Sequence, residues 1–200
     1  MNEKIPSQKT GSKSDTASKV VLENEQLAAE HYQTVKNRFF DVNLWHLFAG
    51  EEKAEFALRD SQGNLSQEKP KVGDYITIKI PALHNPDGDG YDWVMVEHIE
   101  EKNEDHYESA YMRVRPASDP KTPTDKTVHF FDNQATSNFI IERDGNTVSA
   151  EVHARNEVPN TEDLNLLEKI RNSVVALGGM LIGSKIQWKA FADGLIKYEE

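Results

Sequence analysis

The sequence contains no cysteine among its 200 residues. This absence excludes disulfide bonds, thiol nucleophiles, cysteine-ligated zinc and iron–sulfur clusters. A chain of this length can bury enough apolar surface for a stable core without disulfides. The lack of cysteine also favours a reducing compartment, so we expect a cytoplasmic protein.

Positive charge and long apolar runs are also scarce. The formal net charge is -11, from 23 Lys and Arg against 34 Asp and Glu. Nucleic acids and anionic membranes need a concentrated basic surface, so we expect neither as a partner. No segment approaches the roughly 20 apolar residues of a membrane span. We therefore expect a soluble protein whose partner is another protein or an apolar small molecule.

Motifs for catalysis, cofactors and metals are missing as well. The sequence has no G-x-S-x-G, H-E-x-x-H, P-loop or G-x-G-x-x-G pattern. The segment from Asp87 to Asp92 is rich in carboxylates, but Tyr91 and His98 stand where an EF-hand needs oxygen ligands. An ordinary turn is favoured there, and we expect no metal and no cofactor.

The chain begins with residues that are poor in large apolar side chains. Residues 1–19 are rich in Ser, Thr, Lys and Gly, which predicts a disordered tail. Residues 20–200 are then expected to form a single α+β domain. This domain starts with a short helical segment, because apolar residues return to one face at Leu27, Ala28, His31, Tyr32, Val35 and Phe39.

The middle of the chain has the alternation of apolar and polar residues that is typical of β-strands. We predict about six or seven strands, over 54–60, 75–80, 93–99, 110–115, 128–131, 138–143 and 146–155. Asp144 and Gly145 predict a two-residue hairpin between the last two strands. In that register Ile141 would face Val148.

The last forty residues contain the longest apolar stripe. At spacings of three and four, it comprises Leu167, Ile170, Val174, Leu177, Leu181, Trp188, Phe191 and Leu195. This pattern predicts one long amphipathic helix, bent rather than broken at Gly178, Gly179 and Gly183. Such a stripe must be buried, so we predict a curved antiparallel sheet packed on this long C-terminal helix.

This order of elements resembles that of helix-grip domains, although no sequence motif carries the resemblance and no functional residue is transferred from it. A sheet curled around a helix can enclose an apolar cavity. Here we expect the cavity to be lined by Trp93, Met95, Phe139, Met180, Trp188 and Phe191. The alternative is that these side chains fill the space themselves.

The densest polar cluster surrounds His153. As an enzyme site, His153 would be a general base positioned by a carboxylate, with Arg155 holding an anionic or carbonyl group and Glu157 nearby. However, the strand alternation that buries Val152 also turns these three side chains to the opposite face. A solvated strip of alternating charge is therefore the favoured interpretation.

Three functions remain open at this point. The first is a non-enzymatic binding or assembly module, favoured because no catalytic constellation is visible. The second is a carrier that holds an apolar small molecule between the sheet and the C-terminal helix. The third is an enzyme that uses His153, Arg155 and Glu157 for acid–base chemistry.

Overall fold

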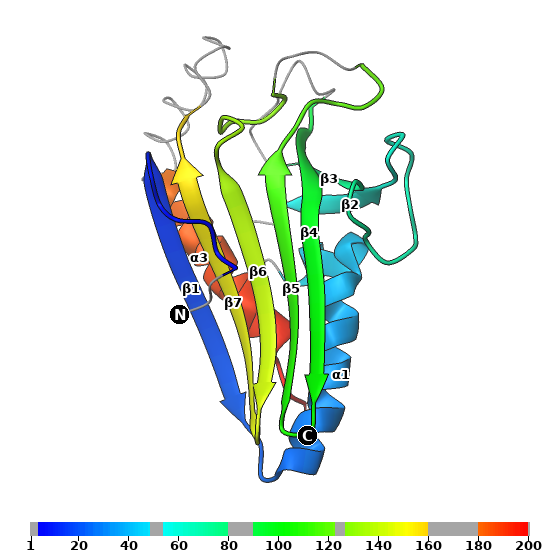
Figure 1. Ribbon diagram of the computed structural model, residues 1–200, viewed down its shortest axis with the longest axis vertical. Helices are drawn as coiled ribbons and strands as arrows, with labels where there is room; N and C mark the ends of the chain where they lie inside the picture. Colours follow the sequence, from blue (N-terminus) through cyan, green and yellow to red (C-terminus); the bar gives the residue numbers. More distant parts are fainter. Residues whose placement is uncertain (1–3, 49–53, 80–89, 123–126, 160–179, 200) are drawn as a thin grey trace.

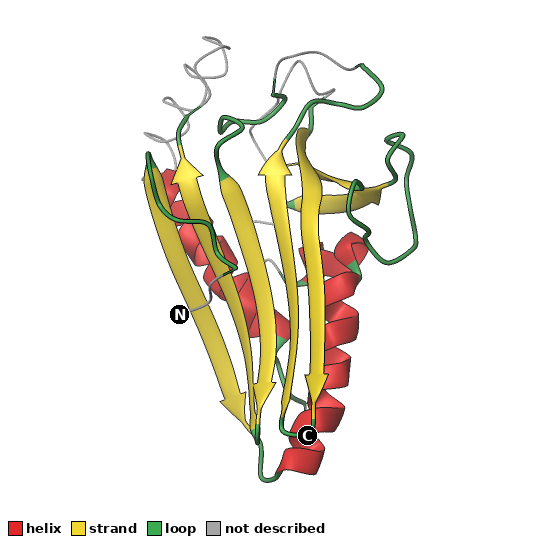
Figure 2. Ribbon diagram, viewed as in Figure 1, coloured by secondary structure: helices red, strands yellow, loops and turns green. Residues whose placement is uncertain are grey.

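The computed structural model describes residues 4–48, 54–79, 90–122, 127–159 and 180–199. In chain order, its elements are β1 (Ser12–Val21), α1 (Glu25–Phe40), the 3-10 helix η1 (Val42–Leu47), β2 (Glu55–Arg59), β3 (Tyr75–Lys79), β4 (Asp92–Glu104), β5 (Tyr107–Pro116), β6 (Thr136–Asp144), β7 (Thr147–Glu157) and α3 (Met180–Leu195). These strands form one antiparallel sheet in the order β1-β7-β6-β5-β4-β3-β2. The sheet curves in front of α1 and α3 in Figures 1 and 2. The predicted α+β fold, a curved antiparallel sheet with a C-terminal helix, is confirmed.

The core lies between the concave face of the sheet and the helices. Trp45 of η1 stands at its centre, with ring centroids 5.0 Å from both Phe139 of β6 and Phe191 of α3. Its indole Nε1–H donates to the carbonyl of Phe39 at 3.0 Å, so the buried polar atom is satisfied. Within the described part of the chain, no helix is long and apolar enough to cross a membrane.

The C-terminal end of α3 is fixed by two side chains of α1. His31 Nε2 lies 2.9 Å from the carbonyl oxygen of Ile196. Arg38 donates to the carbonyls of Leu195 at 3.0 Å and Lys197 at 2.8 Å. The last carbonyls of a helix lack partners within the helix, so these contacts cap α3 and anchor it to α1. The first half of the predicted stripe, from Leu167 to Leu177, lies outside the described residues.

The predicted disordered tail over residues 1–19 is wrong in its second half. Ser12–Val21 form β1, which pairs with β7 at one edge of the sheet. Its inward positions carry Ser14 and Ser18, both buried, so the strand lacks the apolar alternation that identifies the others. The Ser18 hydroxyl donates to Asp193 of α3 at 2.5 Å. Ser18 is thus paired with the helix by a hydrogen bond, which replaces the usual apolar contact.

Two details of the strand prediction also need correction. The segment from Val128 to Phe131 is no strand; it contributes one isolated bridge, between Phe131 and Pro159. The β6–β7 hairpin pairs Ile141 with Ala150 rather than with Val148, because the two turn residues are Gly145 and Asn146. Gly145 has a φ of 57°, which glycine adopts without strain. A shift of two residues keeps every side chain on its predicted face.

A bulge near the end of β7 turns the last residue of the strand, Glu157, to the other face of the sheet. Asn156 has a φ of 57° and is the one described non-glycine residue with positive φ. Opposite it, the β1–β7 register jumps from Ser14–Ala154 to Ser12–Glu157. The Asn156 side chain accepts from the backbone N–H of Lys9 at 2.7 Å, which stabilises this conformation. After the bulge, Glu157 is buried instead of following its outward-facing neighbours.

Gly11 supports this bulge, and its substitution tests it. Gly11 has a φ of 64°, and a Cβ added there would overlap the backbone oxygen of Glu157. Gly73 also has a positive φ, 93°, but a Cβ added there would have no atom within 4 Å. We expect Gly11→Ala to lower the free energy of unfolding by about 3 kcal/mol and the control Gly73→Ala by about 1 kcal/mol. Urea denaturation measures both, and equal losses would contradict the close approach.

Candidate functional site

A cavity lies between the sheet and α3, beside the aromatic core. Its volume is about 90 Å³. Most of the wall is apolar and comprises Trp45, Ala54, Phe56, Ile76, Ile78, Val94, Val114, Phe130, Phe131, Phe139 and Trp188. Three polar residues, His129, Ser137 and Glu157, complete the described lining. An apolar chamber with a few polar groups on one side is the usual form of a small-molecule site.

Of the six residues predicted to line the cavity, some line it, one lies beside it and two lie on the other face of the sheet. Phe139 and Trp188 line the cavity, with ring centroids 5.4 Å apart. Phe191 is buried next to it, 5.8 Å from Trp188 in the same aromatic cluster. Met180 is the first residue of α3, and its side chain is not among those described.

Trp93 and Met95 lie on the other side of the sheet, and their assignment to the cavity was wrong. Val94 and Val96 take the inward face of β4 and belong to the core. Trp93 instead packs on Tyr75 of β3, with ring centroids 6.0 Å apart. Both faces of this strand carry apolar residues, so the alternation does not identify the inner one.

Glu157 forms part of the polar side of the cavity. The hydroxyl of Ser12 donates to its carboxylate at 3.1 Å, so the edge strand β1 contributes to the position of this group. Its side chain is buried by the bulge, whereas β-strand alternation alone places it outside. The sequence does not reveal this change of face, although an Asn flanked by strand residues is a common signal for positive φ.

His129 is the second polar group, and it is held as a neutral imidazole. Burial lowers the pKa of His129 to about 3. The backbone N–H of Phe131 donates to Nδ1 at 2.9 Å, which places the ring proton on Nε2. His129 is therefore suited to donating a hydrogen bond and unsuited to accepting a proton near neutral pH.

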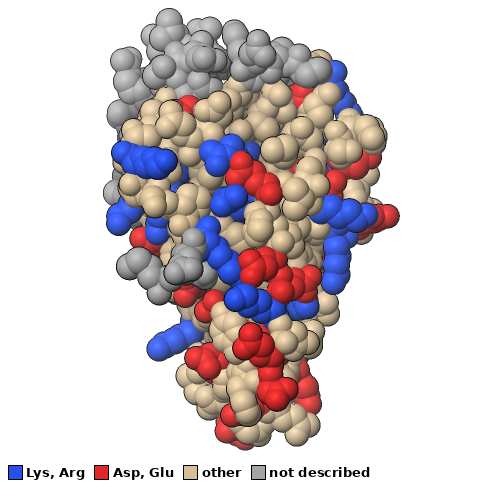
Figure 3. Space-filling model, viewed as in Figure 1, with Lys and Arg blue, Asp and Glu red and all other residues tan. Residues whose placement is uncertain are grey.

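The predicted cluster around His153 forms on the outer face of β1 and β7. His153 Nδ1 lies 2.6 Å from Asp15, and Nε2 lies 2.7 Å from Glu151. Arg155 pairs with the same Asp15 oxygen at 2.5 Å. Figure 3 shows acidic and basic side chains interspersed over this face of the sheet. The side chains on this face alternate in charge as predicted, but His153 and Arg155 are only 14% and 13% exposed. Glu157 is buried elsewhere, so the predicted solvated strip forms only in part.

This arrangement does not assemble the proposed catalytic set. Both ring nitrogens of His153 face carboxylates, so neither is available to take a proton from a substrate. Glu157 lies on the opposite face, in the cavity lining, and is separated from His153 and Arg155. Among the described residues, no group of three or more His, Asp or Glu side chains is placed to hold a metal ion. Asp87 and Asp89 of the carboxylate-rich loop lie outside those residues.

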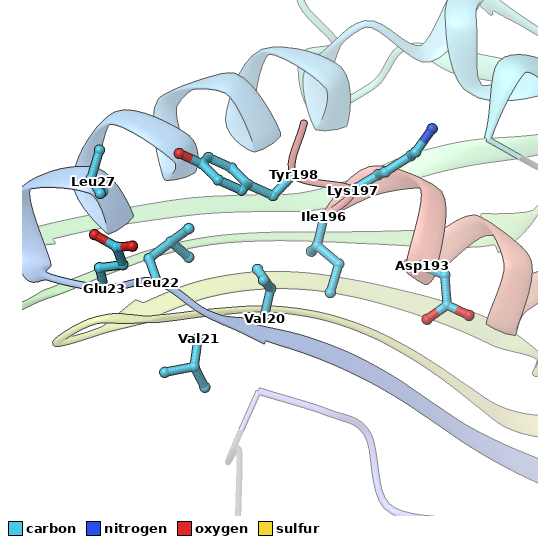
Figure 4. A pocket seen from close by; sticks show the side chains of 9 residues that line it. All are labelled: Val20, Val21, Leu22, Glu23, Leu27, Asp193, Ile196, Lys197 and Tyr198. Carbon is cyan, nitrogen blue, oxygen red and sulfur yellow. The ribbon is translucent and has the colours of Figure 1, made fainter. Parts of the chain in front are cut away.

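A larger groove of about 680 Å³ opens on the surface at the C-terminal end of α3. Figure 4 shows it between the end of β1, the start of α1 and the segment that follows α3. Its walls mix apolar side chains such as Val20 and Ile196 with charged ones such as Asp193 and Lys197. This groove lacks the enclosure and the apolar lining of the inner cavity.

No protein-family model matches the sequence, and no curated protein matches it. Solved structures resemble the chain at low sequence identity. A hypothetical protein of Helicobacter pylori is 13% identical with a TM-score of 0.49, over 94% of this chain and 88% of that one. Ginseng major latex-like protein 151 from Panax ginseng is 12% identical with a TM-score of 0.35, over 84% and 98%. Norcoclaurine synthase from Thalictrum flavum is 8% identical with a TM-score of 0.33, over 88% and 85%.

The His153 cluster makes stability depend on pH. Burial lowers the pKa of His153, but the hydrogen bonds and charges of Glu151 and Asp15 outweigh it and leave the pKa raised above 6.5. The folded state therefore binds the proton more tightly than the unfolded state. The resulting stabilisation is complete below the unfolded pKa and is lost as pH rises through the folded pKa.

We expect His153→Gln to lower the free energy of unfolding at about pH 5.5 and to have a much smaller effect at about pH 9. Urea denaturation at both pH values measures this difference. The control is His106→Gln, which removes an exposed contact with Glu25 and should cost little at either pH. A larger loss for His153→Gln at the higher pH would contradict the assignment.

Proposed function

We propose that this protein is a non-enzymatic binding module that holds a small, largely apolar molecule in the cavity between the sheet and α3. The observation that supports it is the placement of Glu157, with His129 and Ser137, in the wall of a mainly aromatic and aliphatic cavity. A carboxyl group has two oxygens that together accept several hydrogen bonds, so Glu157 offers a polar anchor at one point of the wall. The expected ligand therefore has an apolar body and one group that donates a hydrogen bond.

The volume of the cavity sets the size of this ligand. A cavity of about 150 Å³ lined by apolar residues is known to hold benzene. The described walls leave about 90 Å³, which is less than a benzene ring occupies there, so a ring-sized ligand requires a side chain to move. Trp188 is only partly buried and borders the cavity, so rotation of its side chain is the adjustment that would admit a complete ring.

The pKa of His129 and the hydrogen bonds of His153 favour binding over catalysis. His129 borders the cavity, but its low pKa and the donor on Nδ1 prevent it from acting as a base. His153 is on the other face with both nitrogens paired. His129 therefore lacks a suitable pKa for acid–base chemistry, and His153 lacks an unpaired ring nitrogen.

The role of Glu157 is tested by comparing phenol with toluene as probes. The two are similar in size and shape, but only phenol donates a hydrogen bond, and a carboxylate accepts several such bonds. Because only phenol can donate a hydrogen bond to Glu157, we expect phenol to bind about tenfold more tightly. Glu157→Gln should reduce this preference to a few-fold or less while toluene affinity changes little. Titration calorimetry gives both affinities, and an unchanged preference would contradict the assignment.

A second pair of variants tests the position of the site. Ile78 lines the cavity and is only partly buried, so Ile78→Phe should fill the space with little cost in stability. We expect it to weaken phenol binding at least tenfold. The control is Ile99→Phe, a similar enlargement of a partly buried residue on β4 that does not line the cavity. Equal effects of the two substitutions would place the probe elsewhere.

A further inference from the structure

The edge strand β1 offers a second site, for a macromolecule. The order of strands in the sheet ends at β1, and among the described residues β1 pairs with β7 alone. It is ten residues long and contains no proline. A long unpaired edge is a template for a further strand, and native proteins usually cover or interrupt it.

The hydrogen-bonding pattern identifies which backbone groups face outward. Leu22, one residue beyond β1, donates its N–H to the carbonyl of Asn146 at 2.9 Å. Hydrogen bonding alternates along an antiparallel pair, and the register is regular from Ser14 to Val21. Ala17, Lys19 and Val21 therefore direct their N–H and C=O groups away from β7. Figure 4 shows the matching alternation, since the side chains of Val20 and Val21 point to opposite sides of the strand.

We propose that a second copy of this chain pairs antiparallel with this edge, around a two-fold axis at Ala17. In this register Asp15 of each copy lies opposite Lys19 of the other copy. The carboxylate of Asp15 is 45% exposed although it contacts His153 and Arg155. Lys19 is exposed and makes no ion pair within the described chain. Opposite charges across two strands stabilise the pairing and fix its register.

Other registers lack this charge match. The outward backbone groups belong to odd-numbered residues, so odd positions must pair with odd positions. An axis at Asp15 places two carboxylates opposite each other, and an axis at Lys19 places two ammonium groups opposite each other. The axis at Ala17 alone pairs Asp15 with Lys19 at both ends. This axis also places Ala17, the smallest side chain on the outer face of β1, at the centre of the contact between the two copies.

The interface is expected to be modest in size. One pair of strands buries less than the roughly 1,200 Å² of a stable protein–protein interface. The dimer should therefore exist in a concentration-dependent equilibrium with the monomer. This inference does not depend on the proposed ligand site. The residues on which it rests, Asp15, Ala17 and Lys19, do not line the cavity.

Sedimentation velocity on the full chain at increasing concentration tests the proposal. We expect wild type to shift from monomer to dimer. Ala17→Pro should remain monomeric at all concentrations, because it removes an outward N–H, and proline is tolerated on a strand edge at such a position. Lys19→Glu should weaken the dimer at least tenfold, because it places a carboxylate opposite Asp15. The matched control, Lys71→Glu in an exposed loop, should dimerise like wild type.

Hydrogen exchange supplies an independent readout. The amides of Ala17, Lys19 and Val21 should exchange more slowly at high protein concentration, and those of Thr16, Ser18 and Val20, already bonded to β7, should change little. Circular dichroism verifies that both β1 variants are folded. A wild-type chain that stays monomeric would overturn the proposal, as would a dimer that both Ala17→Pro and Lys19→Glu leave intact.

Discussion

The contact of Trp45 with Phe139 and Phe191 sets the spacing between the sheet and α3. These three rings come from η1, β6 and α3, and each pair with Trp45 has a centroid separation of 5.0 Å. Large rings hold the layers apart at this point. Toward β1 the layers approach more closely, because Ser14 and Ser18 are small and Ser18 bonds directly to Asp193. The cavity forms on the other side of the rings, where the side chains of the described residues leave space unfilled.

The two faces of β7 carry different chemistry. Outward residues form an ion cluster in which Asp15, Glu151, His153 and Arg155 hold the edge strand to its neighbour. Inward residues are apolar and support the core. The bulge at Asn156 is the exception, since it brings one carboxylate from the polar series into the apolar chamber. A change in one backbone conformation therefore creates the polar part of the candidate site.

The sequence predicts the fold well where one face of an element is clearly apolar. The inward residues of the β6–β7 hairpin, such as Phe139 and Val152, are buried as expected. β1 is missed because its inward residues before Val20 are serine and threonine, which resemble a disordered segment in composition. Trp93 is placed on the wrong side because β4 is apolar on both faces. The position of Glu157 depends on a positive φ at Asn156 that is stabilised by residues about 150 positions away, and an Asn within a strand pattern does not by itself predict that the next side chain turns inward.

β1 connects these features, although its composition predicts no structure at all. Ser12 at its start bonds to the cavity carboxylate, and Ser18 near its end bonds to α3. Asp15 between them joins the ion cluster on the outer face. A strand that supplied apolar side chains instead would bury more surface but would separate α3 from the sheet and remove these polar links. The serines therefore provide less hydrophobic stabilisation but allow α3 to pack closely on the sheet. The charges along the edge of the strand are self-complementary, because Asp15 and Lys19 can pair with each other in two copies.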